Sequence, residues 1–417
     1  MTTRLATAAA DSALVQSLHA SYGEHYGPVE QEQRLASLND LDELAFPTSK
    51  TEFWKYTRVN RLLKQDVAFQ PDERAEDAPA IEGLNAVRIH IRNGHAGQNT
   101  SLPDGVDVRV LGAGAELPES FGALAQPRHH VMEAMNTAFC PEILVLRIAP
   151  NKKIEDVIEL SFTASNGSVH QPRVMIDAGA GSSATVLMRY SSPNGATGFT
   201  NSLSEIHVGA NARLNVFKME HEGNQWFHHS ADYARIFDGG HFEIVTAPES
   251  GGWTRNNLRI RLDGKQAFAR LNGLYLLEGN RHLDNNTFVD HAVPHCDSSE
   301  LYKGVLYDES TAVFNGKVIV RPDAQKTNAF QQNNNLVLSE NAQQFSKPEL
   351  EIYADDVKCS HGSTTGQMDE EAIFYLQSRA IDKTEATRML VAAFAAEVID
   401  QVENEAIRSY FYDKFTQ

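Results

Sequence analysis

Cysteine is scarce in this sequence, since the 417 residues contain only Cys140, Cys296 and Cys359. An odd and sparse set argues against a disulfide framework and for a reducing compartment. A metal cluster held by cysteines alone needs about four thiolates. The chain therefore cannot bind such a cluster through its own cysteines without further ligands.

Long apolar runs are also missing, because no stretch of about 18 consecutive apolar residues occurs. The N-terminal stretch MTTRLATAAADSALVQSLHA is rich in small residues, but Asp11 interrupts the apolar core that a signal peptide needs. We interpret this stretch as an amphipathic helix. We expect that the protein does not span a membrane and that it is cytoplasmic.

Positive charge is in deficit, with 37 Lys and Arg against 55 Asp and Glu and a formal net charge of −18. A nucleic-acid interface needs a patch of Lys and Arg to neutralise phosphates. The net negative charge therefore argues against DNA or RNA as a partner. It otherwise mainly keeps the protein soluble.

Familiar catalytic motifs are absent as well. The sequence has no GxxxxGK[ST] loop, no GxGxxG between a strand and a helix, and no GxSxG elbow. We therefore predict that the chain does not hydrolyse ATP itself and is not an enzyme.

The periodicity of the apolar residues divides the chain into three predicted domains: a helical domain over 1–85, a strand-rich core over 86–366 and a helical domain over 367–417. Further predictions within these domains are helices over 31–44, Glu52–Leu63 and 128–140, a linker over 70–83, and C-terminal helices that Asp369 and Asp382 cap.

One unit recurs through the strand-rich core: a strand, a tight turn and a second strand, as in RVMIDAGAGSSATVLMRY and SEIHVGANARLNVFKM. Such repeats favour a solenoid or a propeller. A WD40-type blade needs about 40–45 residues, more than most of these units supply, so stacked coils of a β-helix fit better. The Asn runs at 285–286 and 333–335 fit either polar ladders between coils or ordinary turns.

An aromatic tail ends the chain, in the helix predicted for ENEAIRSYFYDKF. Tyr410, Phe411, Tyr412 and Phe415 lie within it. These side chains either fold back on the domain, which is the commoner case, or form a docking surface for another protein.

The stretch YADDVKCSHGSTTG places Cys359 and His361 two residues apart. In a strand, residues i and i+2 share one face about 6.6 Å apart, so both side chains could reach one metal ion. Two ligands do not complete a metal site, and the rest must come from elsewhere. A nucleophile with its base and two structural residues are the alternatives, and the spacing alone favours structural residues.

A second group of possible ligands lies in VDHAVPHCDSSELYK, with His291, His295 and Cys296. No CxxC or HExxH spacing accompanies them, and buried structural histidines are at least as good an interpretation. The adjacent His228 and His229 would face opposite sides of a strand, which argues against a shared metal.

Two long stretches, DHAVPHCDSSELYKGVLYDESTAVFNGKVIVRPDAQKTNAFQQNNNLVLSENA and KPELEIYADDVKCSHGSTTGQMDEEAIFYLQSRAI, resemble the SufB/SufD family of iron–sulfur cluster assembly proteins. FPTSKTEFWKYT and ATRMLVAAFAAEVI also look like that family, so the resemblance covers most of residues 41–415. NNNLVLSENA lacks a cysteine where SufB carries its assembly thiol, and Gly362 replaces an acid. Both departures favour the SufD branch.

The resemblance implies a right-handed parallel β-helix core flanked by N-terminal and C-terminal helical domains. It also implies a scaffold subunit that pairs with a SufB-type paralogue and binds a SufC-type ABC ATPase through the C-terminal helices. Cys359 and His361 would then be metal ligands of a transient iron–sulfur cluster shared across the interface. The sequence does not decide whether a flavin binds the complex, or whether the chain forms a homodimer when alone.

A β-helix enzyme that acts on polysaccharides is the alternative from another functional class. Such an enzyme would use acidic residues along one groove. These enzymes are usually exported, whereas we predict no export signal here, and the C-terminal helices have no place in that mechanism.

Overall fold

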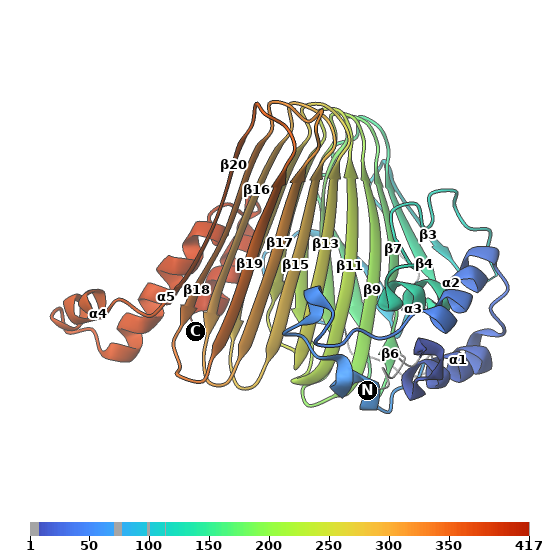
Figure 1. The fold of residues 1–417 in the computed structure, drawn as a ribbon, viewed down its shortest axis with the longest axis horizontal. Helices are drawn as coiled ribbons and strands as arrows, with labels where there is room; N and C mark the ends of the chain where they lie inside the picture. The colour runs from blue at the N-terminus through green and yellow to red at the C-terminus, as the bar shows by residue number, and fades with distance from the viewer. Residues whose placement is uncertain (1–7, 71–76, 98–100, 113, 417) are drawn as a thin grey trace, which may run out of the picture.

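The structure is a computed structural model and describes residues 8–70, 77–97, 101–112 and 114–416. Two sheets of mainly parallel strands coil around a shared interior, and helices flank this β-helix (Figure 1). The predicted mainly β fold, a parallel β-helix with N-terminal and C-terminal helices, is confirmed. In the described part of the chain, no helix has the length and apolar character of a membrane span.

Sheet 1 has ten strands, with a terminal edge at each end. In spatial order they are β2 (His95–Ala96), β1 (Ala86–Arg92), β5 (Val157–Thr163), β8 (Ser183–Ser191), β10 (Arg213–His221), β12 (His241–Pro248), β14 (Phe268–Leu277), β16 (Asp297–Leu306), β18 (Asn328–Val337) and β20 (Lys358–Gly366).

Sheet 2 lies opposite sheet 1. Its strands in spatial order are β19 (Gln343–Ile352), β17 (Thr311–Val320), β15 (His282–His291), β13 (Trp253–Leu262), β11 (Gln225–Ile236), β9 (Thr197–Val208), β7 (Arg173–Ala178), β4 (Ile143–Ile148) and β3 (Val106–Leu111), with the short β6 (Val169–His170) paired to β9.

Successive coils stack in register, which explains the repeat in the sequence. Ser183, Arg213, His241 and Phe268 are aligned partners on neighbouring strands of sheet 1, about 30 residues apart along the chain. Inner strands therefore have a backbone partner on both sides. At the C-terminal end, β19 and β20 have a partner on one side only.

The N-terminal helical elements cover the outer face of sheet 2. They bury an apolar cluster that includes Phe199, Phe227 and Trp253 of that sheet. Ser12 begins the first α-helix by accepting a hydrogen bond from the backbone N–H of Val15. The elements are η1 (Ala9–Asp11), α1 (Ala13–Tyr26), α2 (Glu32–Glu43), η2 (Glu52–Trp54), η3 (Val59–Lys64) and α3 (Val131–Phe139).

The C-terminal helices α4 (Glu370–Gln377), α5 (Lys383–Ile399) and α6 (Glu405–Thr416) follow the last strand. Asp369 caps α4 and Asp382 caps α5, as predicted. The aromatic tail folds back on sheet 1: Phe411 and Phe415 are buried, and the Tyr410 hydroxyl donates to Glu249 at 2.8 Å.

The prediction of a single helix over Glu52–Leu63 is wrong. The chain instead forms two short 3₁₀ helices, η2 and η3, because contacts to sheet 2 hold the turn between them. The Thr57 hydroxyl donates to Asp284 at 2.5 Å, and Arg255 donates to the backbone carbonyl of Phe53 at 2.9 Å.

Both Asn runs lie in strands and not in turns, but only the run at 285–286 forms a ladder between coils, because the aligned partners of 333–335 on β16 are Tyr302, Lys303 and Gly304. Asn257, Asn286 and Asn315 are aligned on three successive strands of sheet 2. In the interior, Asn335 donates to Asn333 at 2.9 Å.

Two predictions fall partly outside the described residues. The linker over 70–83 includes 71–76, and the N-terminal helix was expected over a stretch that includes 1–7. The three-domain division stays a prediction.

Aromatic rings cover glycines between neighbouring coils, and this contact can be tested. A Cβ on Gly304 would lie 2.0 Å from Cε2 of Tyr275, whereas a Cβ on Gly362 would meet nothing within 4 Å. We expect Gly304→Ala to lower the free energy of unfolding by about 1–3 kcal/mol through overpacking. Urea titration should show no such loss for the control Gly362→Ala, and equal effects would contradict the packing argument.

Candidate functional site

Cys359 and His361 lie on β20, the last strand of sheet 1. They are aligned with Ala329 and Gln331 of β18, which are both buried. Cys359 packs against the interior apolar cluster, and His361, two residues on, shares its face of the strand. Both side chains therefore face the interior of the β-helix at its C-terminal end.

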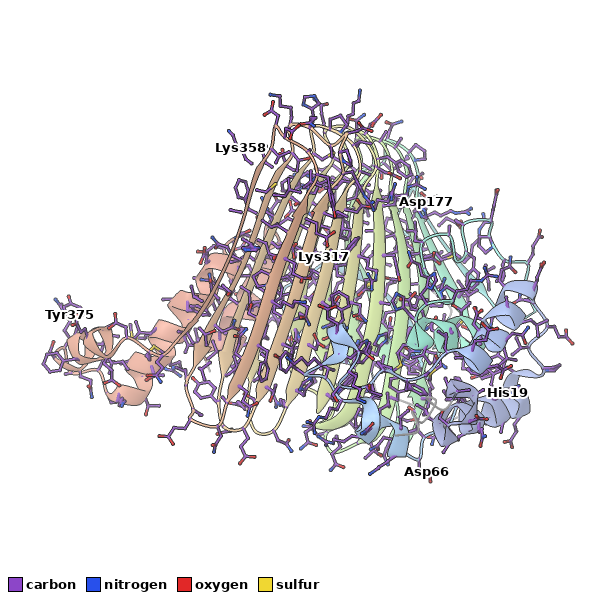
Figure 2. All side chains as sticks on the ribbon, viewed as in Figure 1. His19, Asp66, Asp177, Lys317, Lys358 and Tyr375 are labelled. Carbon is purple, nitrogen blue, oxygen red and sulfur yellow. The ribbon has the colours of Figure 1, made fainter. Side chains whose placement is uncertain are left out.

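No strand follows β20 in its sheet, so the interior is open at this point. Cys359 is partly buried and His361 is exposed. Figure 2 shows Lys358, the first residue of β20, at the rim of the solenoid. The sequence predicted that Cys359 and His361 share one face of a strand, and β20 places them in this way. The thiol and the imidazole are both accessible to solvent or to another chain.

Burial raises the pKa of the Cys359 thiol above its usual range, against a hydrogen bond from the backbone of Ala329. The thiol is therefore mainly protonated at neutral pH. A metal ion binds the thiolate and releases this proton, so the affinity for a metal should rise with pH.

Cys359 and His361 do not form a complete metal site by themselves. Within the described residues, no group of three or more His, Cys, Asp or Glu side chains is placed to hold a metal ion. A tetrahedral site takes about four ligands. The pair can supply at most part of such a site.

The second candidate group separates into structural residues. The His291 imidazole is buried and contacts the Ser298 hydroxyl at 2.8 Å, and burial lowers its pKa to about 4. Cys296 is buried with its thiol 3.1 Å from the carbonyl of Gly264, and burial raises its pKa to about 11. His295 has a positive φ of 62° in the turn before β16. The structure does not join these side chains into a metal group.

His228 and His229 face opposite sides of β11, as predicted. The His228 ring contacts Glu222 at 2.9 Å, whereas the His229 ring contacts Asn201 at 2.9 Å. Among the described residues, the two rings share no hydrogen-bond partner and belong to no metal-binding group.

Family models match nearly the whole chain. The model described as "SufBD protein N-terminal region" matches residues 11–160, and "SUF system FeS cluster assembly, SufBD core domain" matches residues 161–394. The chain belongs to the SufBD family of iron–sulfur cluster assembly proteins. The boundary between the two models falls inside β5, so they do not define the domains of this SufBD fold.

Relatives agree with the family models. The iron–sulfur cluster assembly protein SufD of Escherichia coli is 31% identical over an aligned length of 410 residues, and the alignment covers 92% of this chain and 92% of the relative. An iron–sulfur cluster assembly SufBD family protein of Synechocystis is 30% identical over an aligned length of 393 residues, and the alignment covers 89% of this chain and 87% of the relative. The chloroplastic protein ABCI7 of Arabidopsis thaliana is 30% identical over 288 residues, 66% of this chain and 60% of the relative.

The interior of this SufBD β-helix is polar on one side, which the sequence reasoning missed. Lys218 donates to Asp232 at 2.8 Å and to Asn256 at 3.1 Å, all three buried. Burial opposes the charge of Lys218, but Asp232 and Glu220 outweigh it and raise its pKa. The sequence carried a signal for this polar side, because Lys218 and Glu220 follow Leu214 and Val216 at the period of two that marks the interior residues of β10.

The polar interior continues to the open end. Glu300 accepts hydrogen bonds from Thr287 at 2.6 Å and from Gln331 at 3.1 Å. Burial raises the pKa of Glu300 to about 7 despite these bonds. Gln331 is the aligned neighbour of His361, so a titratable carboxyl lies two strands from the exposed imidazole.

Three large apolar side chains are exposed on the C-terminal helices of this SufBD family member. Phe374 is 72% exposed and Tyr375 55% exposed on α4, and Met389 is 43% exposed on α5. Figure 2 shows Tyr375 at the tip of this helical arm. We call these three residues the α4–α5 patch. The sequence reasoning singled out the aromatics of α6 instead, since exposure within a helix depends on its packing.

Exposure and pKa together predict how the cysteines react. Cys140 and Cys296 have 0% exposure, whereas Cys359 is only partly buried. We expect a thiol-alkylating reagent to label Cys359 alone in the native protein. Because its pKa is raised, the labelling rate should still increase between pH 8 and pH 10. Mass spectrometry of timed samples measures this.

The variant Cys359→Ser is the control and should remain unlabelled until the protein is denatured. Native labelling of Cys296 at a comparable rate, or a rate for Cys359 that levels off below pH 8, would contradict the burial of these thiols.

Proposed function

We propose that this chain is the SufD-type scaffold subunit of a Suf assembly complex and is not itself an enzyme. Cys359 and His361 would supply two ligands to a nascent iron–sulfur cluster at the junction with a SufB-type paralogue. The observation that supports this most directly is that both side chains face the open end of the β-helix interior. The same proposal places the protein in the cytoplasm.

The two ends of the β-helix differ in a way that favours the C-terminal end as the junction. At the N-terminal end, the antiparallel strands β2 and β3 pair with β1 and β4. These strands are edges too, but β2 has two residues and β3 has six, whereas the edges at the C-terminal end, β19 and β20, have ten and nine residues and leave a longer row of backbone donors and acceptors without a strand among the described residues. Such edges pair readily with another strand. A homologous β-helix that meets this end would extend both sheets.

The incomplete ligand set supports a shared site. The described residues contain no group of three metal-binding side chains, and β20 supplies only a thiol and an imidazole. A paralogue would complete the coordination, and the cluster would be cargo that leaves the junction. In the absence of the paralogue, the same edges would allow two copies of this chain to pair as a homodimer.

The α4–α5 patch supports docking of a SufC-type ATPase on the C-terminal helices. Large exposed apolar side chains on a polar arm are typical of protein interaction sites. The sequence lacks a P-loop, so a partner would supply ATP hydrolysis. The polysaccharide-acting alternative has no observation in its favour.

Single substitutions test the ligand role. In the complex co-expressed with SufB-type and SufC-type partners, we expect Cys359→Ser and His361→Ala each to lower bound iron and sulfide at least about twofold, because one of about four ligands is lost. Ser360→Ala is the matched control, since Ser360 faces the opposite side of β20. Unchanged cluster content and unchanged maturation of client proteins in both ligand variants would overturn the assignment.

The docking proposal is tested on α4. We expect Phe374→Ser combined with Tyr375→Ser to weaken binding of the SufC-type ATPase at least about tenfold, since aromatic anchors dominate interface energies. Phe330→Ser, which removes a 47% exposed aromatic from β18, is the control. Titration calorimetry measures both.

Deletion of residues 367–417 should also abolish this binding while the β-helix stays folded. The deletion is a coarser test, because it uncovers the face of sheet 1 that α5 and α6 bury. ATPase binding that survives both changes would place the docking surface elsewhere.

A further inference from the structure

A cavity of about 400 Å³ lies on the outer face of sheet 2, away from Cys359 and His361. The segment that precedes and includes η2 forms one wall, and β13, β15 and β17 form another. Small-molecule sites typically measure about 300–1,000 Å³ and are mainly apolar, with a few polar groups. The apolar lining fits this description and includes Phe46, Phe53, Trp54, Met132 and Phe288.

One cation in the lining has no ion-pair partner among the described residues. Of the three Arg and Lys side chains there, Arg255 pairs with Asp284, and Lys317 pairs with Glu351 at 2.6 Å. Figure 2 shows Lys317 on the exposed face of the sheet. Arg259 makes no ion pair in the described structure, and its buried Nε has no hydrogen-bond partner there.

Asn286 supplies a second donor without a partner in the same lining. It is the middle rung of the Asn ladder and is only 7% exposed, yet no described group accepts from its Nδ2. Arg259 is aligned with Phe288, two residues after Asn286, so the two donors lie close together on neighbouring strands. Buried hydrogen-bond donors normally have an acceptor. Two neighbouring donors without one therefore indicate a place where an acceptor from outside the chain would bind.

The acidic side chains of the lining do not supply this acceptor. The Glu133 carboxylate accepts from the Tyr233 hydroxyl at 2.7 Å and from the backbone N–H of Gln126 at 2.8 Å. Glu349 pairs with Lys347 at 2.9 Å.

Burial raises the pKa of Glu133 in the same lining, against hydrogen bonds from Tyr233 and Gln126 and the charge of Arg259, so this carboxyl offsets Arg259 less than a fully ionised one would. Burial and the nearby charge of Arg259, then those of His129 and Arg255, lower the pKa of His130 to about 4. His130 is therefore neutral at physiological pH, in a setting where added positive charge is unfavourable. An anion would relieve the same repulsion.

We propose that this cavity binds a small organic anion, namely an aromatic body that carries a carboxylate or a phosphate. Arg259 and Asn286 donate to the anionic oxygens, and the aromatic wall contacts the ring. Charge-assisted hydrogen bonds of this kind are stronger than neutral ones. The site is separate from the proposed cluster junction, and binding there would tie the N-terminal segment to sheet 2.

Calorimetric titration of the full-length chain with phenyl phosphate, benzoate and benzamide at matched ionic strength tests the proposal. We expect at least one of the two anions to bind with a Kd of about 1 mM or below, and benzamide to bind at least tenfold more weakly. The tighter anion identifies the group that the site prefers, phosphate or carboxylate.

Variants assign the binding to the two donors. Arg259→Gln and Asn286→Asp should each weaken anion binding at least tenfold. Arg261→Gln is the matched control and should stay within about twofold. Arg261 is the next outward residue of β13 and carries the same charge, but it pairs with Asp263 and Asp290 and does not line the cavity.

Thermal unfolding of each variant establishes that it is folded before it is titrated. The proposal is overturned if neither anion binds below about 10 mM, if benzamide binds as well as the anions, or if Arg259→Gln and Arg261→Gln have equal effects.

Discussion

Pairing of each coil with the next, in register and in parallel, is the constraint on which this structure depends. An inner strand such as β16 has backbone partners on both sides, so it is stable only between β14 and β18. The stack must therefore end somewhere with an edge. Antiparallel strands occupy the N-terminal end, and the C-terminal end is left with β19 and β20. The Cys359 and His361 pair lies at that end because β20 is the last strand.

Register also determines what the interior contains. Equivalent residues of successive coils stack in columns, so one polar side chain must be matched by the next. Lys218 of β10 is buried and charged, and its partners Asp232 and Asn256 reach it across the interior from β11 and β13 of sheet 2. Removing one member of such a network leaves the others uncompensated, which is costly in a low-dielectric interior. The column of Glu300, Gln331 and His361 carries this polar character to solvent.

Much of the fold could be predicted from period-two alternation and from the recurring turns, because both are local. The capping of α4 by Asp369 and of α5 by Asp382 follows from the same kind of local chemistry. The single helix over Glu52–Leu63 was predicted wrongly, because the Thr57 hydroxyl donates a hydrogen bond to Asp284, which lies 227 residues further along the chain. Intrinsic helix preference does not include such contacts.

The candidate site divides in the same way. The sequence by itself determined that Cys359 and His361 share one face of a strand, and that three cysteines are too few for a cluster bound by thiolates alone. Only the tertiary structure decided that this face points into an open interior, that Cys296 and His291 are buried, and that Arg259 lacks an ion pair in the described residues. Facing within a strand is a local property, whereas burial and partners depend on which coil stacks next.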